Sequence, residues 1–218
     1  MFSVREMRQM ICANHYTGSI PSGENIFTQF EDAIVIFSRP ANKNISNWLV
    51  GADNLVWELS RMWAPDGHRK TLLTEAIASC VEEFARAVKR LSSGECHALI
   101  SYADPNAGHT GTVYRAASWQ YLGQSEESRY YKGPAGEIVS RRGFHSGDRN
   151  MTKAEILARG FSELSRPGKH LFARGLSKWT QRRIKNHAAR RLDAPLPRGV
   201  SAVRHRGAAP IIATASFD

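Results

Sequence analysis

The sequence predicts an α/β protein with a mixed central sheet flanked by helices, followed by a basic C-terminal helix and an extended tail. Short apolar runs typical of strands alternate with segments of helical periodicity, which is the pattern of layered α/β domains. A long helix near 70–91 separates apolar runs at 54–65 and 96–104, so we expect a right-handed crossover that places these two strands parallel. The chain has 218 residues, 42% of them hydrophobic, which is enough for one domain core.

The N-terminal half is predicted to contain two helices and two strands. Apolar residues at steps of three or four predict a short helix over 3–13 and the long helix near 70–91. The runs 31–40 and 54–65 are rich in apolar and β-branched residues, and a proline stops each of them, so both are predicted strands.

The C-terminal half continues the alternation. We expect a buried strand at 96–104, a short helix at about 110–117 and a strand over 119–125. A meander or flap should follow at 126–150, and Thr152 with Glu155 forms a predicted capping box at the start of another helix. The last elements are a strand, "KHLFARGL", and a basic helix, "SKWTQRRIKNHAARRL".

The charge is concentrated at the C-terminus. Residues 1–150 carry 16 Lys and Arg against 16 Asp and Glu, whereas residues 151–218 carry 14 against 4. We therefore predict a catalytic core at 1–150, a basic part of the same domain at 151–192 and an extended tail at 193–218. A cationic segment on a neutral body indicates a polyanion partner, most commonly nucleic acid; the alternative is a solubilising tail.

The sequence also indicates a compartment. Three cysteines without CxxC spacing argue against a disulfide framework or a structural zinc site. The charged N-terminus does not resemble a signal peptide, and no apolar run is long enough to span a membrane. We expect a soluble cytoplasmic protein, which could be a homodimer.

Candidate site residues cluster where strands end, because α/β sheets bind ligands beyond the carboxyl ends of their strands. Asp104 ends one predicted strand, in "SYADPNAGHTGTVYRAASWQYLG", although an Asp before Pro-Asn can also simply start a turn. Tyr114 lies in the helix that follows and could point back to the same strand end. Arg61 lies in an otherwise apolar strand and must meet a carboxylate, a phosphate or solvent.

Other candidates lie outside this stretch. His15 and Tyr16 lie in a polar loop, and Thr74 lies near the start of the long helix. The basic helix combines cations with an aromatic side chain, a pattern that suits phosphate contact and stacking. Its candidate nucleic-acid-binding residues are Lys178, Trp179, Arg182, Arg183 and Lys185. No P-loop, GxGxxG, HExxH or GxSxG motif occurs, which weakens several common enzyme classes.

Four segments together resemble the Mom proteins of Mu-like phages. They are "NHY", "WELSRMW", a helix-opening Thr and "SYADPNAGHTGTVYRAASWQYLG", which span roughly residues 5–125. The resemblance implies a GCN5-related N-acetyltransferase-like fold and an enzyme that modifies adenine in phage DNA, protecting it from host restriction. It also implies a set of catalytic residues, which by our matching are His15, Tyr16, Arg61, Thr74 (or Ser79), Asp104 and Tyr114.

The resemblance also implies the product, which carries a CH2–CO–NH2 group on adenine N6. From the connectivity of this product we expect glycyl-tRNA to be a fitting donor. Acetyl-CoA is the alternative donor, although "PDGHRKT" lacks the paired small residues of an acetyltransferase pyrophosphate loop. The DNA would be double-stranded with the target adenine flipped out. An iron ion held by His15 and Asp104 is a further possibility. Two other functions stay open: an ordinary N-acetyltransferase and a non-catalytic nucleic-acid-binding protein.

Overall fold

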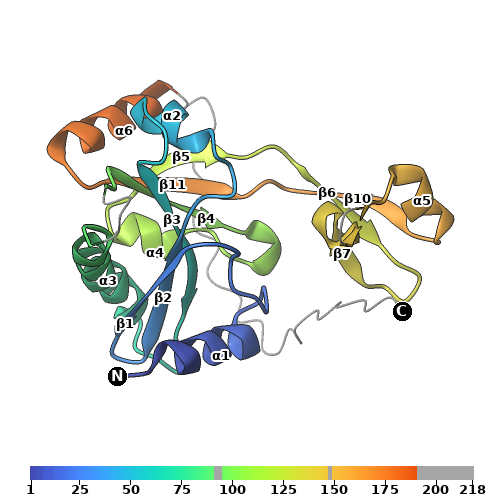
Figure 1. Ribbon diagram of the computed structural model, residues 1–218, viewed down its shortest axis with the longest axis horizontal. Coiled ribbons are helices and arrows are strands. Elements are labelled where there is room, and N and C mark those ends of the chain that lie inside the picture. The colour runs from blue at the N-terminus through green and yellow to red at the C-terminus, as the bar shows by residue number, and fades with distance from the viewer. Residues whose placement is uncertain (91–94, 147–148, 191–218) are drawn as a thin grey trace.

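The computed structural model describes residues 1–90, 95–146 and 149–190, and one six-stranded sheet forms its centre (Figure 1). The strands lie in the order β1-β2-β3-β4-β11-β5; β3 and β4 run parallel, while the other neighbours in this sheet pair antiparallel. The predicted mixed sheet and its parallel crossover are therefore confirmed. The strand bounds are β1 Asn25–Phe30, β2 Ala33–Ser38, β3 Val56–Trp63, β4 Ala98–Ala103, β5 Gln120–Gln124 and β11 His170–Gly175.

The long helix α3 (Leu72–Val88) covers one face of the sheet, with the short helix α4 (Thr112–Ala116) beside it. Apolar side chains at helical spacing give α3 a continuous buried stripe. Phe84 of this stripe packs on Trp57 of β3, with ring centroids 5.3 Å apart. Tyr114 of α4 belongs to the same core, so α4 is attached to the sheet through its aromatic side chain.

Helices α1 (Val4–Asn14), α2 (Ile45–Val50) and α6 (Lys178–Arg190) cover the opposite face. Ile184 of α6 is fully buried against this face, while most of the charged residues of α6 face solvent. Because helices cover both faces, β2 is buried along its whole length, which explains its uninterrupted apolar sequence.

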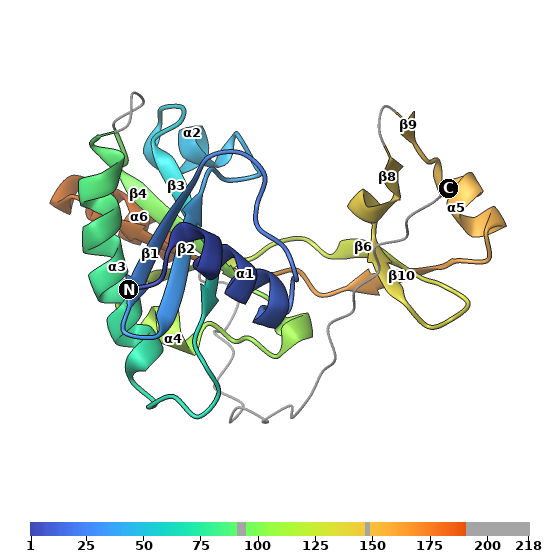
Figure 2. The same cartoon turned by 60° about the horizontal axis from the view of Figure 1, so that its bottom comes forward.

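Residues 126–166 form a small lobe that projects from the edge of the sheet (Figures 1 and 2). Two connections join it to the sheet, one from β5 to β6 and one from β10 to β11. The lobe has its own core, centred on Tyr131, Phe144 and Ile156. Its elements are β6 Ser128–Lys132, β7 Ile138–Ser140, η2 Arg141–Phe144, β8 His145–Ser146, β9 Arg149–Asn150, α5 Lys153–Ala158 and β10 Ser162–Arg166. The predicted capping box of Thr152 and Glu155 is present at α5.

The small lobe and α6 lie on opposite sides of the sheet in both views. The domain boundary that we placed at residue 150 falls inside the lobe, because β10 pairs with β6 across it. The predicted tail at 193–218 lies outside the described residues. No helix in the described ranges is long and apolar enough to cross a membrane.

Apart from the short 3₁₀ helices, three elements were not predicted: β1, α2 and β10. Each is at most six residues long, and each is fixed by its neighbours more than by its own sequence. β1 pairs with β2 as an edge strand, and α2 packs against α6, more than 120 residues further along the chain. The sequence of β10, "SELSR", contains one apolar residue, so no alternation marks it as a strand.

Candidate functional site

A pocket lies where the parallel strands β3 and β4 separate. Their pairing covers only residues 56–58 and 98–100. Beyond that point the hydroxyl of Ser101 donates to the carbonyl oxygen of Leu59 at 2.7 Å, in place of a main-chain bond. A cavity of about 260 Å³ opens there, at the carboxyl ends of the strands as expected. Cavities for drug-sized ligands start at roughly 300 Å³, so this one suits a single planar ring system.

Three further segments complete the wall of the pocket. His15 and Tyr16 come from the end of α1, and Leu73 comes from the first turn of α3. The third segment is the loop 109–114, which follows the short helix η1 (Pro105–Ala107) and enters α4. The structure therefore brings together His15, Tyr16, Arg61 and Tyr114 of the predicted catalytic set, since all four line this pocket.

Gly111 fixes the position of the loop. Its φ is +75°, in the left-handed region that strains residues with a side chain. A Cβ at this position would lie 2.1 Å from the ring of Phe172 in β11. The loop can therefore approach the sheet this closely only with glycine, and the approach holds α4 against the pocket.

The hydroxyl of Tyr114 lies beside Ser101, whose own hydroxyl donates to the carbonyl of Leu59. Burial raises the pKa of Tyr114 to about 12, which keeps the phenol protonated. A protonated phenol can both donate a hydrogen bond to a ligand and accept one from it.

His15 is neutral and has a defined tautomer. The main-chain N–H of Thr17 donates to His15 Nδ1 at 3.2 Å, and Thr17 Oγ1 lies 2.8 Å from the same atom. Since an N–H can only donate, Nδ1 accepts and the ring proton lies on Nε2. Burial, with help from the nearby Arg61, lowers the pKa of His15 to about 3. His15 can therefore offer a donor to a ligand without carrying a charge.

Tyr16 is the exposed aromatic residue of the pocket, with 43% of its surface accessible. Its ring lies edge-on to His109, with centroids 5.1 Å apart, and 4.5 Å from the ring of His15. Burial of the hydroxyl raises the pKa of Tyr16, and the negative charge of Asp104 and the phenol of Tyr130 in the small lobe raise it further. The lobe therefore lies close to the same side of the pocket as Tyr16.

Arg61 is held by main-chain carbonyls. Its Nε donates to Ser19 at 2.9 Å and its Nη1 to Ser60 at 2.7 Å. Burial lowers its pKa, although the guanidinium stays charged at any physiological pH. The sequence predicts a carboxylate, a phosphate or solvent as the partner of Arg61. In the structure main-chain carbonyls take this role, and the carboxylate of Asp104 pairs with Lys169.

Asp104 lies beside the pocket and is not part of its lining. Its Oδ1 accepts from the main-chain N–H and the amide of Asn106, at 2.9 and 3.0 Å, which is the turn geometry that the sequence left open. Its Oδ2 lies 3.2 Å from Lys169 Nζ. Burial raises the pKa of Asp104, but Lys169 and Asn106 outweigh this effect and leave the pKa below its ordinary value. Asp104 thus anchors the loop that forms the pocket wall, and its carboxylate is a weak base.

The residues predicted to hold iron do not fit a metal site. His15 is neutral and accepts from the N–H of Thr17 at Nδ1, so the one lone pair of its ring is already engaged. Both oxygens of Asp104 are engaged by Asn106 and Lys169. In the described ranges, no group of three or more His, Cys, Asp or Glu residues could hold a metal ion. We derive no step through a metal.

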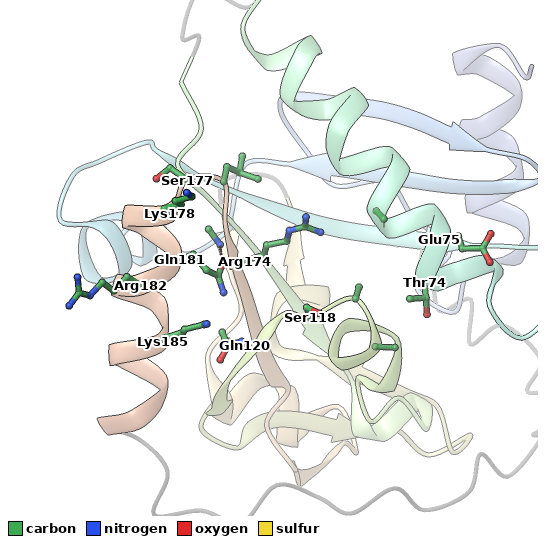
Figure 3. A pocket seen from close by; sticks show the side chains of 15 residues that line it. Thr74, Glu75, Ser118, Gln120, Arg174, Ser177, Lys178, Gln181, Arg182 and Lys185 are labelled. Carbon is green, nitrogen blue, oxygen red and sulfur yellow. Dashed lines mark hydrogen bonds between the residues drawn. The ribbon is translucent and has the colours of Figure 1, made fainter.

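A second hollow, the basic groove, lies between α6 and the α3–α4 side of the molecule (Figure 3). Its volume is about 960 Å³, nearly four times that of the pocket. Four cations line it, Arg174 at the end of β11 and Lys178, Arg182 and Lys185 on α6. Thr74 lines the far end of the groove, so the structure places it outside the pocket that holds the other predicted catalytic residues.

The remaining nucleic-acid candidates on α6 differ in exposure. Trp179 is 59% exposed and is open to a partner. Arg183 donates from Nε to the carbonyl of Leu49 at 2.9 Å, and its guanidinium packs near Gly51. Arg183 therefore holds α2 against α6 and is a structural contact.

Two important residues of the site were not predicted. Lys169 carries no signal in the sequence, because its partner Asp104 is 65 positions away. Ser101 looks like an ordinary polar residue of a strand. His109 was part of the predicted loop, but its contact with Tyr16 depends on how α1 meets that loop.

These features define a class: mixed α/β proteins with a small ligand pocket at the ends of parallel strands and a separate surface suited to polyanions. The chain belongs to the Mom protein family, whose sequence model matches residues 2–189. No curated protein matches the chain. Membership of this family indicates a role in the modification of adenine in phage DNA.

Proposed function

We propose that the protein transfers a glycine-derived group to N6 of adenine in double-stranded DNA and so protects phage DNA from restriction. The observation that carries this proposal is the small pocket between β3 and β4, which offers both an acceptor and a donor to a single ring system. Adenine presents an N6 amino group that donates and an N1 that accepts, which complements such a pocket.

The target base must leave the duplex, because N6 is paired inside it. Tyr16 has the exposure to stack on an extruded base at the pocket. Trp119 and Tyr121 are not available for stacking, because Trp119 is only 3% exposed and Tyr121 packs on Phe172 in the core.

The pocket residues would position the amine and polarise the donor. Tyr114 would accept from the N6 amino group through its phenol oxygen, and burial keeps this phenol protonated and uncharged. The Nε2–H of His15 and the charge of Arg61 would stabilise the oxyanion that forms on the acyl carbonyl. An aromatic amine is a poor nucleophile, so this positioning would supply most of the acceleration. Asp104 would act on the chemistry through the loop that it anchors.

Glycyl-tRNA is the proposed donor. N6 attacks the carbonyl carbon of the glycyl ester; a C–N bond forms, the ester C–O bond breaks, and the departing ribose oxygen takes the proton lost from N6. The glycine amine then attacks C6 through a five-membered ring, and the bond from C6 to the original nitrogen breaks. That nitrogen becomes the amide of the CH2–CO–NH2 group, and no oxidant or reductant is needed.

The test uses DNA, tRNA charged with ¹⁵N-glycine and mass spectrometry of the nucleosides. The proposal expects a modified adenine that keeps ¹⁵N on the base after hydrolysis of its amide, since the glycine nitrogen becomes the new N6. A product without label would exclude this route. If hydrolysis of the amide instead left a carboxymethyl group on an N6 without ¹⁵N, the original nitrogen would have stayed on C6. That result would exclude the rearrangement.

Acetyl-CoA is the donor of the alternative proposal, an ordinary acetyltransferase. The start of α3, where a pyrophosphate would be expected, carries Arg69, but Glu31 and Glu75 already engage it at 2.8 and 2.6 Å. These two carboxylates would repel a pyrophosphate. Acetyl-CoA binding by calorimetry would favour the alternative.

A further inference from the structure

The basic groove contains more positive charge than the fold requires. Its four cations are Arg174, Lys178, Arg182 and Lys185. Within the described part of the chain, none of the four has a carboxylate within ion-pair distance. Three of them are exposed on one helix, where they repel one another and add nothing to the core. Such a cluster is stabilised by an anionic ligand.

The shape of the groove indicates a long ligand. Figure 3 shows Lys178 and Lys185 on α6 at one end, and Thr74 and Glu75 on α3 at the other. Arg174 projects between the two ends, and Lys185 points from α6 toward Gln120. Such a groove would hold an elongated anionic ligand. Its phosphates would lie along α6, beside the exposed cations, and its terminus would lie at α3, beside neutral or acidic side chains.

The α3 end of the groove is directly behind the pocket. Thr74 lines the groove, while its neighbour Leu73 lines the pocket. Helix α4 is shared in the same way, because residues 112–114 line the pocket and residues 116–118 line the groove. A ligand that lies in the groove therefore ends beside the pocket wall that α3 and α4 form, whereas Tyr16 enters the pocket from the end of α1.

We infer that the basic groove binds the phosphate backbone of a structured RNA that brings the activated donor group to the pocket. The choice of RNA rests on the proposed function, which needs a carrier distinct from the DNA. Under the proposed function, the DNA whose base enters the pocket would lie on the Tyr16 side, whereas α6 lies on the side of the sheet away from the small lobe. Because a stiff duplex does not bend around the molecule without cost, the groove serves a second nucleic acid.

Binding measurements test this inference without any chemical step. The variant is Lys178→Gln, Arg182→Gln and Lys185→Gln combined. The matched control is Arg86→Gln, Lys89→Gln and Arg90→Gln combined, which removes the same charge from exposed positions at the other end of α3 and just beyond it. Fluorescence anisotropy compares deacylated tRNA with a DNA duplex of equal phosphate number at several salt concentrations, and circular dichroism confirms folding of both variants.

We expect the groove variant to lose on the order of tenfold or more in tRNA affinity, with a salt slope lower by about two to three. Its duplex affinity and both affinities of the control variant should change by less than about twofold. Equal losses for tRNA and duplex would overturn the inference and assign the groove to DNA. Unchanged tRNA binding would overturn it as well.

These outcomes are separable from those of the proposed function. If the labelled-glycine experiment fails but the groove variant loses tRNA selectively, the RNA site stands and the chemistry does not. If label enters adenine but the groove variant binds tRNA normally, the chemistry stands and the carrier binds elsewhere.

Discussion

The pocket and the basic groove share helix α4 as a wall but differ in almost every physical property. The pocket is about 260 Å³ and contains side chains whose hydrogen bonds are already made within the protein, such as those of Arg61 to the carbonyls of Ser19 and Ser60. The groove is about 960 Å³ and is lined by cations that lack protein partners in the described ranges. Committed hydrogen bonds position a reacting group, whereas unpaired charge attracts a polyanion. The pocket is therefore the region where the chemistry would occur, and the groove is the region where a carrier would bind.

The largest expected effect separates catalysis from binding. Asp104→Ala should lower adenine modification by about a hundredfold or more, because it removes the turn to Asn106 and the ion pair to Lys169 that fix the pocket loop. Binding of tRNA and of duplex DNA should stay within about twofold of the wild type. Nucleoside mass spectrometry and anisotropy measure the two effects.

Asp66→Ala, at an exposed position outside both cavities, is the matched control and should leave activity unchanged. Full activity of Asp104→Ala would remove Asp104 from the site.

The next effect concerns the wall that both cavities share. Gly111→Ala should lower the free energy of unfolding by about 3 kcal/mol, since its Cβ would overlap the ring of Phe172 in addition to the left-handed strain. Gly108→Ala is the matched control, because its φ is also +75° but no atom lies within 4 Å of the added Cβ. Gly108→Ala should lower the free energy of unfolding by about 1 kcal/mol. Urea unfolding measures both, and equal costs would show that the loop does not depend on Phe172.

A smaller effect is expected in how the free energy of unfolding depends on pH, and it comes from His15 in the pocket. The pKa of His15 is about 3 in the folded protein against 6.5 as its ordinary value. As the pH falls below 6.5, the unfolded chain binds a proton at His15 and the folded chain does not, so stability is lost down to about pH 3. His15→Gln should flatten the stability curve in this window.

The control for this pH profile is His97→Gln, whose side chain is 41% exposed. An identical pH profile for wild type and His15→Gln would contradict the buried, neutral state of His15.

The smallest effect lies at the edge of the groove. Trp179→Ala should weaken tRNA binding by about 1 kcal/mol, because an exposed indole on α6 can stack on an unpaired base. Stability should not change at this 59% exposed position. Leu157→Ala, on α5 of the small lobe, removes a comparably exposed apolar side chain away from the groove. A loss confined to duplex DNA would instead extend the DNA-binding surface to α6.

Several parts of the site could be predicted because their signals are local. Strand ends mark where ligands bind, so the stretch from 101 to 123 pointed to the correct edge of the sheet. The basic helix was visible from charge alone. The resemblance to the Mom proteins placed Thr74 in the catalytic set, but helical phase places Leu73 toward the pocket and Thr74 toward the groove.

The sequence by itself determined the long helix, the parallel crossover around it and the concentration of charge at the C-terminus, because periodicity and composition are properties of neighbouring residues. The tertiary structure alone decided that Asp104 pairs with Lys169, that Ser101 donates to Leu59 where the parallel strands separate and that α6 lies away from the small lobe. These are contacts between segments far apart in the chain. They depend on the insertion of β11 between β4 and β5, which no local pattern encodes.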